Sequence, residues 1–374
     1  MYINAYNVAF DLGMEPKKQL GTVIAKYKVQ LQCKRLKYIR NFARRYTNMN
    51  NKIVLDDIVN VSGNRTDGYI NFGIKPDGSK FRIPVTVIEG EKEGPTLLVD
   101  ACTHGDEYEG AEAIIKISKR LQSGSFAGTF VGVPALNFEA FTFIRRASIT
   151  DDINLNRIFP GNSETYITQR LANTYMERIV KNVDFVITFH GGGDVLHLEP
   201  IVGYIPGDDE LSKKASEMAK AFNVKYTWRM QNLPFDGVTT VAYKDILGIP
   251  SILPEVGSHC DRLHNREKNV DICYDGITNV MNYLKMIDGK IDEPVKQMDV
   301  ELHYLHANNG GIQTHYKKEN EIVEQGEILA GITDVFGNVI EELKAPYRGV
   351  VIGFWSIPVI RPGDWWYLFA KILD

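Results

Sequence analysis

The amino-acid sequence predicts an α/β fold, in which a mostly parallel central sheet carries helices on its faces and a small all-β region follows. Two patterns support this prediction. Between about residues 69 and 287, apolar strand-like runs alternate with amphipathic helix-like runs, as they do in sheets whose parallel strands are joined by helices. After about Asp292 the helical periodicity ends, and short apolar runs are separated by turn residues, which favours a separate β domain.

The alternating region contains five short apolar runs that predict strands and four longer amphipathic runs that predict helices. The clearest helix has Cys273, Ile277, Val280, Met281 and Leu284 on one face, which is the face expected to pack on the sheet. In chain order the predicted elements are strands 83–88 and 96–101, helix 108–121, strand 129–133, helix 168–181, strand 184–189, helix 210–222, strand 251–253 and helix 270–287.

The turn signals near the C-terminus predict where the β region begins and how it is divided. They are Gly310-Gly311, Gln325-Gly326, Gly337-Asn338, Arg348-Gly349 and Pro362-Gly363. We therefore predict three parts of the chain: a basic extension over residues 1–48, a main α/β domain over 49–292 and a β-rich domain over 293–374.

The first 48 residues contain ten lysines and arginines but only Asp11 and Glu15 as acidic residues. This segment is either an arm that binds RNA or a membrane, or a solvated extension upstream of a domain that begins near Met49, and the second interpretation is the commoner case. The whole chain has 374 residues and a formal net charge of -4, so no general attraction to nucleic acid or to anionic membranes is expected.

The cysteines and the apolar runs indicate the compartment. Cys33, Cys102, Cys260 and Cys273 show no short paired spacing, which argues against a disulfide framework or a cysteine-rich zinc site. No signal peptide is recognisable, and no run approaches the roughly 18 apolar residues of a membrane span. We expect a cytoplasmic protein without membrane association, and the sequence leaves a homo-oligomer open.

The sequence His104-Gly-Asp-Glu107 contains the first candidate metal ligands. His104 and Glu107 stand between a predicted strand and a predicted helix, where polar residues meet at the carboxyl edge of a parallel sheet. The spacing alone is weak evidence, because a chain with eight histidines and 47 acidic residues produces such pairs by chance. A second pair, His264 with Glu267, lies in a polar stretch with no strand before it, so its context favours the first pair.

Two further strands end in residues suited to the same chemistry. His190 follows the strand 184–189, and Glu255 follows the strand 251–253. Zinc held by His104, Glu107 and His190 would keep a fourth position open for water, as hydrolytic zinc sites do, and Glu255 could shuttle the proton. The glycines after His190 could cradle a phosphate, but no Gly-Lys-Ser/Thr follows them, so close approach of the backbone to a ligand is the better interpretation.

A polar stretch after the strand 129–133 contains donors for a carboxylate or an oxyanion. It includes Arg145, Arg146, Asn156 and Arg157, and an arginine can pair with a carboxylate through two hydrogen bonds. The alternative, a charged surface loop, is a priori more common.

Four motifs in order resemble those of the succinylglutamate desuccinylase/aspartoacylase family of the zinc carboxypeptidase superfamily. The resemblance covers roughly residues 80–287 and implies a three-layer, zinc carboxypeptidase-like sandwich. The β-rich domain over 293–374 resembles the barrel-like, biotinyl/lipoyl-type domain that several members carry. No Met-Lys-Met hairpin occurs, so attached biotin or lipoate is not expected. The motifs are His104-Gly-Asp-Glu107 with Glu109-Gly110, Asn154-Leu-Asn156-Arg157 with Phe159-Pro-Gly161, Phe189-His190-Gly-Gly192 and Pro254-Glu255-Val-Gly257.

The resemblance also implies a role for each candidate residue. His104, Glu107 and His190 would bind one zinc ion, and Glu255 would activate water and later protonate the leaving amine. Arg146 would polarise the carbonyl; we prefer it to Arg145 because the family spacing through Asp151 to the Asn-Arg pair fits position 146. Asn156 and Arg157 would hold the substrate carboxylate.

One position departs from the commoner family form. Asn154 stands where many relatives have an aspartate that orients the first zinc-binding histidine, and the loss of such a partner can weaken metal affinity by about 10 to 100-fold.

We therefore expect a zinc-dependent hydrolase, a deacylase acting on the amide bond of a small N-acyl amino acid. The alternatives are a metallocarboxypeptidase that acts on peptides and a catalytically inactive binding protein.

Overall fold

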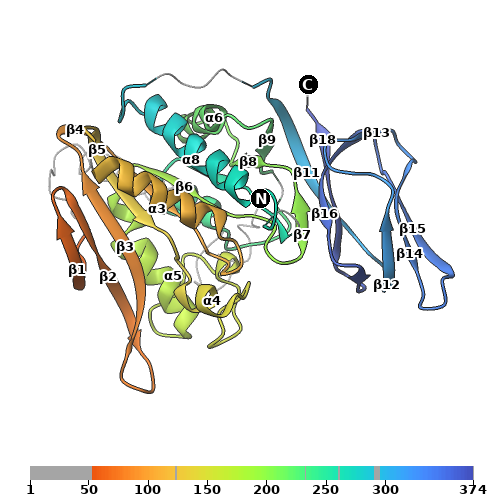
Figure 1. The fold of residues 1–374 in the computed structure, drawn as a ribbon, viewed down its shortest axis with the longest axis horizontal. Coiled ribbons are helices and arrows are strands. Elements are labelled where there is room, and N and C mark those ends of the chain that lie inside the picture. The colour runs from red at the N-terminus through yellow and green to blue at the C-terminus, as the bar shows by residue number, and fades with distance from the viewer. Residues whose placement is uncertain (1–52, 123, 232, 260–261, 290–294, 374) are drawn as a thin grey trace, which may run out of the picture. The chain divides into compact units, whose positions relative to one another are not determined.

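The computed structural model describes residues 53–122, 124–231, 233–259, 262–289 and 295–373. Residues 53–374 form one compact unit (Figure 1). The basic extension predicted over residues 1–48 lies outside the described residues. No helix of the described segments is long and apolar enough to cross a membrane.

The unit is built on a 14-stranded mixed sheet in which most strands follow the order β1-β2-β3-β5-β4-β6-β10-β8-β9-β11-β18-β16-β13, while β7 pairs with β16. Its first ten strands in chain order are β1 (Asp57–Ser62), β2 (Arg65–Ile74), β3 (Lys80–Glu89), β4 (Lys92–Asp100), β5 (Ala127–Val133), β6 (Phe185–Thr188), β7 (Leu196–Leu198), β8 (Ile201–Tyr204), β9 (Tyr226–Arg229) and β10 (Ser251–Glu255).

The helices connect these strands. They are α3 (Glu109–Gln122), α4 (Phe138–Phe143), α5 (Ile167–Arg178), α6 (Glu210–Phe222), α7 (Thr239–Ala242) and α8 (Arg266–Tyr283), with short helical turns η2 (Leu155–Arg157), η3 (Val180–Asn182) and η4 (Tyr243–Leu247).

Helices cover both faces of the sheet because the central strands alternate their side chains. Leu97 and Val99 of β4 pack in one apolar cluster with residues of α3, α6 and α8. Leu98, between them, packs in a second cluster with Leu171 and Tyr175 of α5. Strand residues of alternate parity point to opposite faces, so β4 is buried on both sides, and Figure 1 shows α3 and α8 across the sheet from α5.

The pairing of the large sheet is parallel only in part. Five of its thirteen pairings are parallel, namely β4 with β5, β4 with β6, β6 with β10, β8 with β9 and β9 with β11. The strands added at both ends pair antiparallel. The sheet is therefore mixed, and the parallel pairing expected from the sequence is found around its centre.

The predicted elements of the α/β region all have counterparts. Helix α6 has the predicted ends, whereas α8 begins four residues before the predicted helix, and the predicted helix 168–181 is divided into α5 and the 3₁₀ turn η3. The strands β1, β2, β7, β8 and β9 and the short helices α4 and α7 were not predicted.

The C-terminal residues form strands, as predicted, and belong to two sheets. The strands are β11 (Met298–His306), β12 (Gly311–His315), β13 (Ile322–Val323), β14 (Ile328–Thr333), β15 (Val339–Lys344), β16 (Gly349–Trp355), β17 (Val359–Ile360) and β18 (Trp365–Ile372). β11, β18, β16 and β13 extend the large sheet, whereas β15-β14-β12-β17 form a separate antiparallel sheet. Trp366, Tyr367 and Phe369 lie in the apolar cluster of this region. The domain boundary at residues 292 and 293 stays a prediction.

Candidate active site

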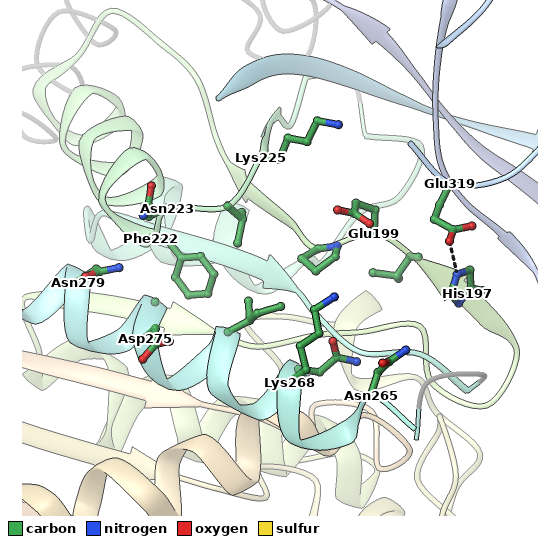
Figure 2. Close-up of a pocket in the computed structure, with 16 residues that line it drawn as sticks. His197, Glu199, Phe222, Asn223, Lys225, Asn265, Lys268, Asp275, Asn279 and Glu319 are labelled. Carbon is green, nitrogen blue, oxygen red and sulfur yellow. Dashed lines mark ion pairs between the residues drawn. The ribbon is translucent and has the colours of Figure 1, made fainter. Parts of the chain in front are cut away.

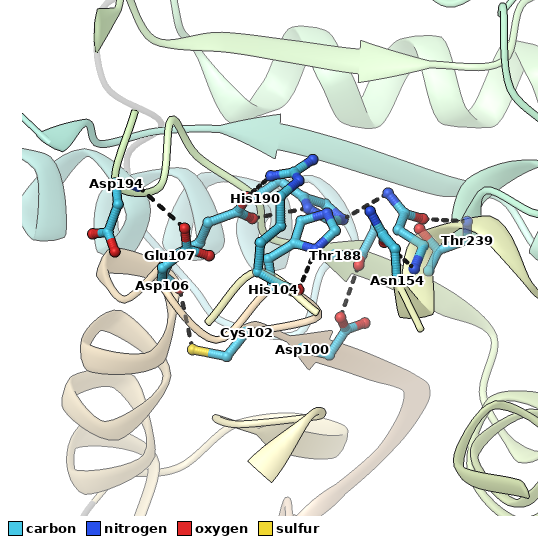
Figure 3. A network of polar contacts seen from close by, with 12 residues as sticks. Asp100, Cys102, His104, Asp106, Glu107, Asn154, Thr188, His190, Asp194 and Thr239 are labelled. Atoms are coloured by element: carbon cyan, nitrogen blue, oxygen red, sulfur yellow. Dashed lines mark hydrogen bonds and ion pairs between the residues drawn. The ribbon is translucent and has the colours of Figure 1, made fainter. Parts of the chain in front are cut away.

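The three predicted metal ligands meet at the carboxyl edge of the central strands (Figure 3). His104 and Glu107 lie in the turn after β4, and His190 follows β6, which pairs with β4. One ligand atom from each residue lies within 4.8 Å of the others, and all three side chains are buried. This group can therefore hold a metal ion.

The turn after β4 is shaped by backbone features close to His104. Cys102 adopts a left-handed conformation with a φ of 55°, which is uncommon outside glycine and often accompanies functional sites. Its thiol donates to the carbonyl oxygen of Glu107 at 3.1 Å. The turn is thus closed on itself, with His104 and Glu107 directed to the same side.

His104 has the protonation state that a metal ligand needs. Its Nδ1 lies 3.1 Å from the carbonyl oxygen of Arg146, and because a carbonyl only accepts, Nδ1 carries the proton and Nε2 carries the lone pair. Burial, reinforced by the positive charge of Arg146, lowers the pKa of His104 well below its usual value. Nε2 is buried and has no hydrogen-bond partner among the described residues, so its lone pair is available to a metal ion.

Glu107 connects the other ligands. His190 Nδ1 lies 2.9 Å from Glu107 Oε2, and Arg146 Nη1 lies 3.0 Å from Glu107 Oε1. Burial alone would lower the pKa of His190, but the negative charge of Glu107 and the hydrogen bond to it outweigh burial and raise that pKa. An imidazole paired with a carboxylate beside a second imidazole is a donor set typical of zinc.

The two adjacent arginines are separated by the fold. Arg146 reaches Glu107, and its side chain is 38% exposed, so it also faces the cleft in front of the ligands. Arg145 is exposed and uses its backbone carbonyl to accept from the amide of Gly105. The structure thus brings Arg146 to the predicted ligands and leaves Arg145 outside the cleft.

Asn156 and Arg157 come from the turn η2 and also line the cleft. Asn156 Oδ1 accepts from the amide of Thr239 at 3.0 Å, which directs its Nδ2 toward His190 Nε2, 3.4 Å away. Arg157 donates to the carbonyl oxygen of Asn156 at 2.8 Å, and its guanidinium carbon lies 3.9 Å from the centroid of the Phe235 ring. Neither contact neutralises its charge.

Asn154 does not contact His104. Its side-chain oxygen accepts from the amide of Asn156 at 3.0 Å and so caps η2. His104 is oriented instead through its Nδ1, which is held by the carbonyl of Arg146. A backbone carbonyl is a common partner of metal-binding histidines, so the substitution at 154 leaves this histidine oriented.

Glu255 ends β10, beside His190. The two residues form an isolated parallel bridge, in which the amide of His190 donates to Pro254 and the amide of Val256 donates to His190, both at 2.9 Å. Burial, with the negative charge of Glu107, raises the pKa of Glu255 to about 7 despite the opposing charges of His190 and Arg146. A carboxylate with a pKa close to neutral can both accept and donate a proton.

The other histidine pair and the glycines have structural explanations. His264 and Glu267 are exposed. An added Cβ at Gly191 would lie 2.5 Å from the carbonyl oxygen of Val256, and one at Gly193, whose φ is +58°, would lie 2.5 Å from the Asp106 carboxylate. These glycines are required by close packing of the protein on itself, and not by a bound phosphate.

Several residues around the site were not predicted. Asp100, at the end of β4, accepts hydrogen bonds from the hydroxyls of Tyr175 and Thr188, both at 2.7 Å. Phe235, Tyr304 and Trp365 form an aromatic cluster beside the arginines. Asp100 has a weak sequence signal, a polar residue at the end of an apolar run, whereas the three aromatic residues look like ordinary core residues in the sequence.

The cleft in front of the ligands is narrow. About 50 Å³ inside it is open to a sphere of the size of a water molecule, and about 670 Å³ is free of atoms when the open mouth is included. A second, larger cleft lies between β7, α6 and α8, with His197, Lys225 and Lys268 in its lining (Figure 2). None of the three predicted ligands lines it, so the chemistry is assigned to the first cleft.

Comparison with known proteins identifies the family. The profile of the succinylglutamate desuccinylase/aspartoacylase catalytic domain matches residues 93–284, slightly more than half of the chain. The chain therefore belongs to the succinylglutamate desuccinylase/aspartoacylase family.

Individual relatives support this membership. The N-alpha-acetyl-L-2,4-diaminobutyric acid deacetylase of Halomonas elongata is 29% identical over 318 residues, which cover 82% of this chain and 92% of the relative. Crystal structures of a succinylglutamate desuccinylase from Silicibacter and of a succinylglutamate desuccinylase/aspartoacylase from Rhodobacter sphaeroides superimpose with TM-scores of 0.75 and 0.76. Their identities are 24% and 23%; the matches cover 86% of this chain and 98% and 100% of theirs, so they support the fold.

Proposed function

We propose that the protein is a zinc-dependent amidohydrolase that removes the acyl group from a small N-acyl amino acid. The single observation that carries this proposal is the buried group of His104, Glu107 and His190, with the carboxylate of Glu255 beside it. Membership of a family that includes an N-acetyl amino acid deacetylase gives the reaction class.

His104, Glu107 and His190 would hold the zinc ion. The neutral state of His104 and the unpartnered lone pair at its Nε2 fit such a ligand. When bound, zinc would supply a Lewis acid that polarises the amide carbonyl and lowers the pKa of water to about 7.

Glu255 would move the protons of the reaction. As a carboxylate it accepts a proton from the attacking water, and as a carboxylic acid it gives that proton to the leaving amine nitrogen when the carbon–nitrogen bond breaks. Both states are accessible near neutral pH because burial raises its pKa to about 7. Such acid–base catalysis contributes about 100 to 10,000-fold to a rate.

The arginines would bind the negative charges. Arg146 donates to the amide oxygen as charge develops there, and Arg157 with Asn156 holds the α-carboxylate of the substrate. Burial and the neighbouring charge of Arg146 lower the pKa of Arg157, so two cations share one cleft and favour an anionic ligand.

A small substrate is favoured over a peptide because the C-terminal strands wall the cleft. Leu302, Tyr304, Ile352, Trp365 and Leu368, from β11, β16 and β18, line it together with the candidate ligands. This wall leaves less room for a long peptide chain than an open groove would. Comparing the rates of hydrolysis of N-acetyl amino acids, dipeptides and longer peptides distinguishes a deacylase from a metallocarboxypeptidase.

The Glu255→Gln variant tests the proposal. We expect hydrolysis of N-acyl amino acids to fall by about 100 to 10,000-fold while the zinc content measured by mass spectrometry stays unchanged. Glu267→Gln, at an exposed position, is the matched control and should retain full activity. A Glu255→Gln protein that hydrolyses as fast as the control would refute the role of Glu255, and absence of hydrolysis in the unaltered protein and in both variants would favour a binding protein.

A further inference from the structure

The cleft in front of the candidate ligands is lined mainly by apolar side chains. Fourteen of its 22 lining residues are aliphatic or aromatic. They come from central strands of the large sheet and from the C-terminal strands that extend it. Among them, Trp228, Met230, Leu253 and Ile352 are at most 4% exposed. The wall is therefore part of the protein core.

Every charged side chain of the lining already has a role in the proposed reaction. Among the described lining residues these are Glu107, Arg146, Arg157 and Glu255. Glu107 is engaged by His190 and Arg146, and Glu255 is needed for proton transfer. No further carboxylate of the described lining is available to pair with a cation on the substrate.

The apolar wall begins next to the proposed carboxylate clamp. The Phe235 ring lies against Arg157, 3.9 Å from its guanidinium carbon to the centroid. Val238 immediately precedes Thr239, whose amide donates to Asn156. A substrate whose carboxylate is held by Arg157 and Asn156 therefore places its neighbouring groups against apolar surface.

The wall is also held rigidly. Phe235 packs on Tyr304 and Trp365 with centroid separations of 5.5 and 5.9 Å, and Tyr304 and Trp365 are 4.7 Å apart. These residues come from a loop, from β11 and from β18, so the cluster fixes the C-terminal strands against the cleft. A rigid apolar wall cannot rotate a polar group inward to meet a charge.

We infer that the substrate carries an apolar chain on its acyl group or on its α-carbon, and that a positively charged side chain is excluded. The inference rests on the proposed deacylase function. Each methylene group buried in such a wall improves binding about 4-fold, whereas a charge buried without a partner is strongly disfavoured. The relative from Halomonas elongata is a deacetylase for a diaminobutyric acid derivative, which has a side-chain amine, so this chain would differ from it.

A matched pair of substrates tests the inference. N-acetyl-L-norvaline and N-alpha-acetyl-L-2,4-diaminobutyrate have side chains of the same length, ending in a methyl and an ammonium group. For the zinc-loaded full chain we expect kcat/KM to be at least about 100-fold higher for norvaline. Equal or faster hydrolysis of the diaminobutyrate compound overturns the inference but leaves the deacylase function intact, and no hydrolysis of any substrate overturns both.

Two substrate series show which part of the substrate meets the wall. One lengthens the side chain, from N-acetylalanine to N-acetylnorleucine, and the other lengthens the acyl chain, from N-acetylglycine to N-hexanoylglycine. A rise of about 4-fold per methylene in either series supports the inference and identifies the group that is read. A flat or falling kcat/KM in both series overturns it.

A variant supplies the missing charge. Leu233 lines the cleft and is only partly buried, so Leu233→Asp can fold, and Leu263→Asp, at an 84% exposed position, is its control. We expect Leu233→Asp to reduce the preference for norvaline over diaminobutyrate by at least about 10-fold, and the control to keep it. An unchanged preference in a folded Leu233→Asp protein contradicts the proposed wall. If this variant does not fold, the comparison of the two substrates on the unaltered protein tests the inference.

Discussion

Replacing Arg146 by alanine removes two interactions whose effects can be measured separately. Its Nη1 lies 3.0 Å from Glu107 Oε1, and its side chain also faces the cleft. Loss of one oxyanion donor typically costs about 100 to 1,000-fold in kcat, or about 3 to 4 kcal/mol of transition-state stabilisation. Loss of the partner of a metal-binding carboxylate weakens metal affinity by about 10 to 100-fold.

The assay separates these effects by titration with zinc. At saturating zinc and substrate, Arg146→Ala should show the full loss in kcat, and the zinc concentration needed for half-maximal activity should rise. Arg145→Ala is the matched control, because that side chain is exposed and should be dispensable. A fall in kcat of less than about 10-fold, or an equal fall in both variants, would refute the oxyanion role.

Three further predictions concern the buried carboxylate beneath the site and the carboxylate clamp. Burial raises the pKa of Asp100 to about 6 from 3.8, so its contribution to stability is complete below about pH 4 and falls by about 3 kcal/mol as the pH rises through 6. In urea denaturation, the free energy of unfolding of the unaltered protein relative to Asp100→Asn should fall by that amount between pH 4 and 7. A difference that stays constant over this range argues against the raised pKa. Tyr175→Phe, which removes the 2.7 Å hydrogen bond to Asp100, should lower the free energy of unfolding by about 1.5 to 3 kcal/mol, whereas Tyr166→Phe, at a 69% exposed position, should not. Arg157→Ala should reduce kcat/KM for N-acyl amino acids by about 10 to 100-fold and leave N-acyl amines, which have no carboxylate, nearly unaffected; equal losses on both would exclude the clamp.

The sequence predicts the central elements well because their periodicity reflects burial. Helix α6 is amphipathic over its whole length, and the second half of strand β4 is apolar because both its faces are covered there. Strand β2 was missed because it lies near the edge of the sheet and mixes polar with apolar residues. β7 and β9 have only three and four residues, too few for a period to be visible.

The same reasoning explains which parts of the site were accessible. His104, Glu107, His190 and Glu255 follow strands of a parallel core, and the geometry of such a sheet predicts that the ends of its strands meet. The carbonyl of Arg146 that orients His104 could not be predicted, because backbone contacts leave no trace in residue identity. The apolar wall was also missed, since Trp365, Tyr304 and Phe235 come from distant parts of the chain and read individually as core residues.

The most direct test of the account is the zinc content of the purified full chain and of two single variants. We predict about one zinc ion per chain in the unaltered protein, loss of most of it in His104→Ala, and full retention in His264→Ala, whose histidine is exposed. Activity should follow the zinc content and disappear with a chelator. An unaltered protein that contains no zinc and hydrolyses N-acyl amino acids equally well with and without chelator would contradict the account.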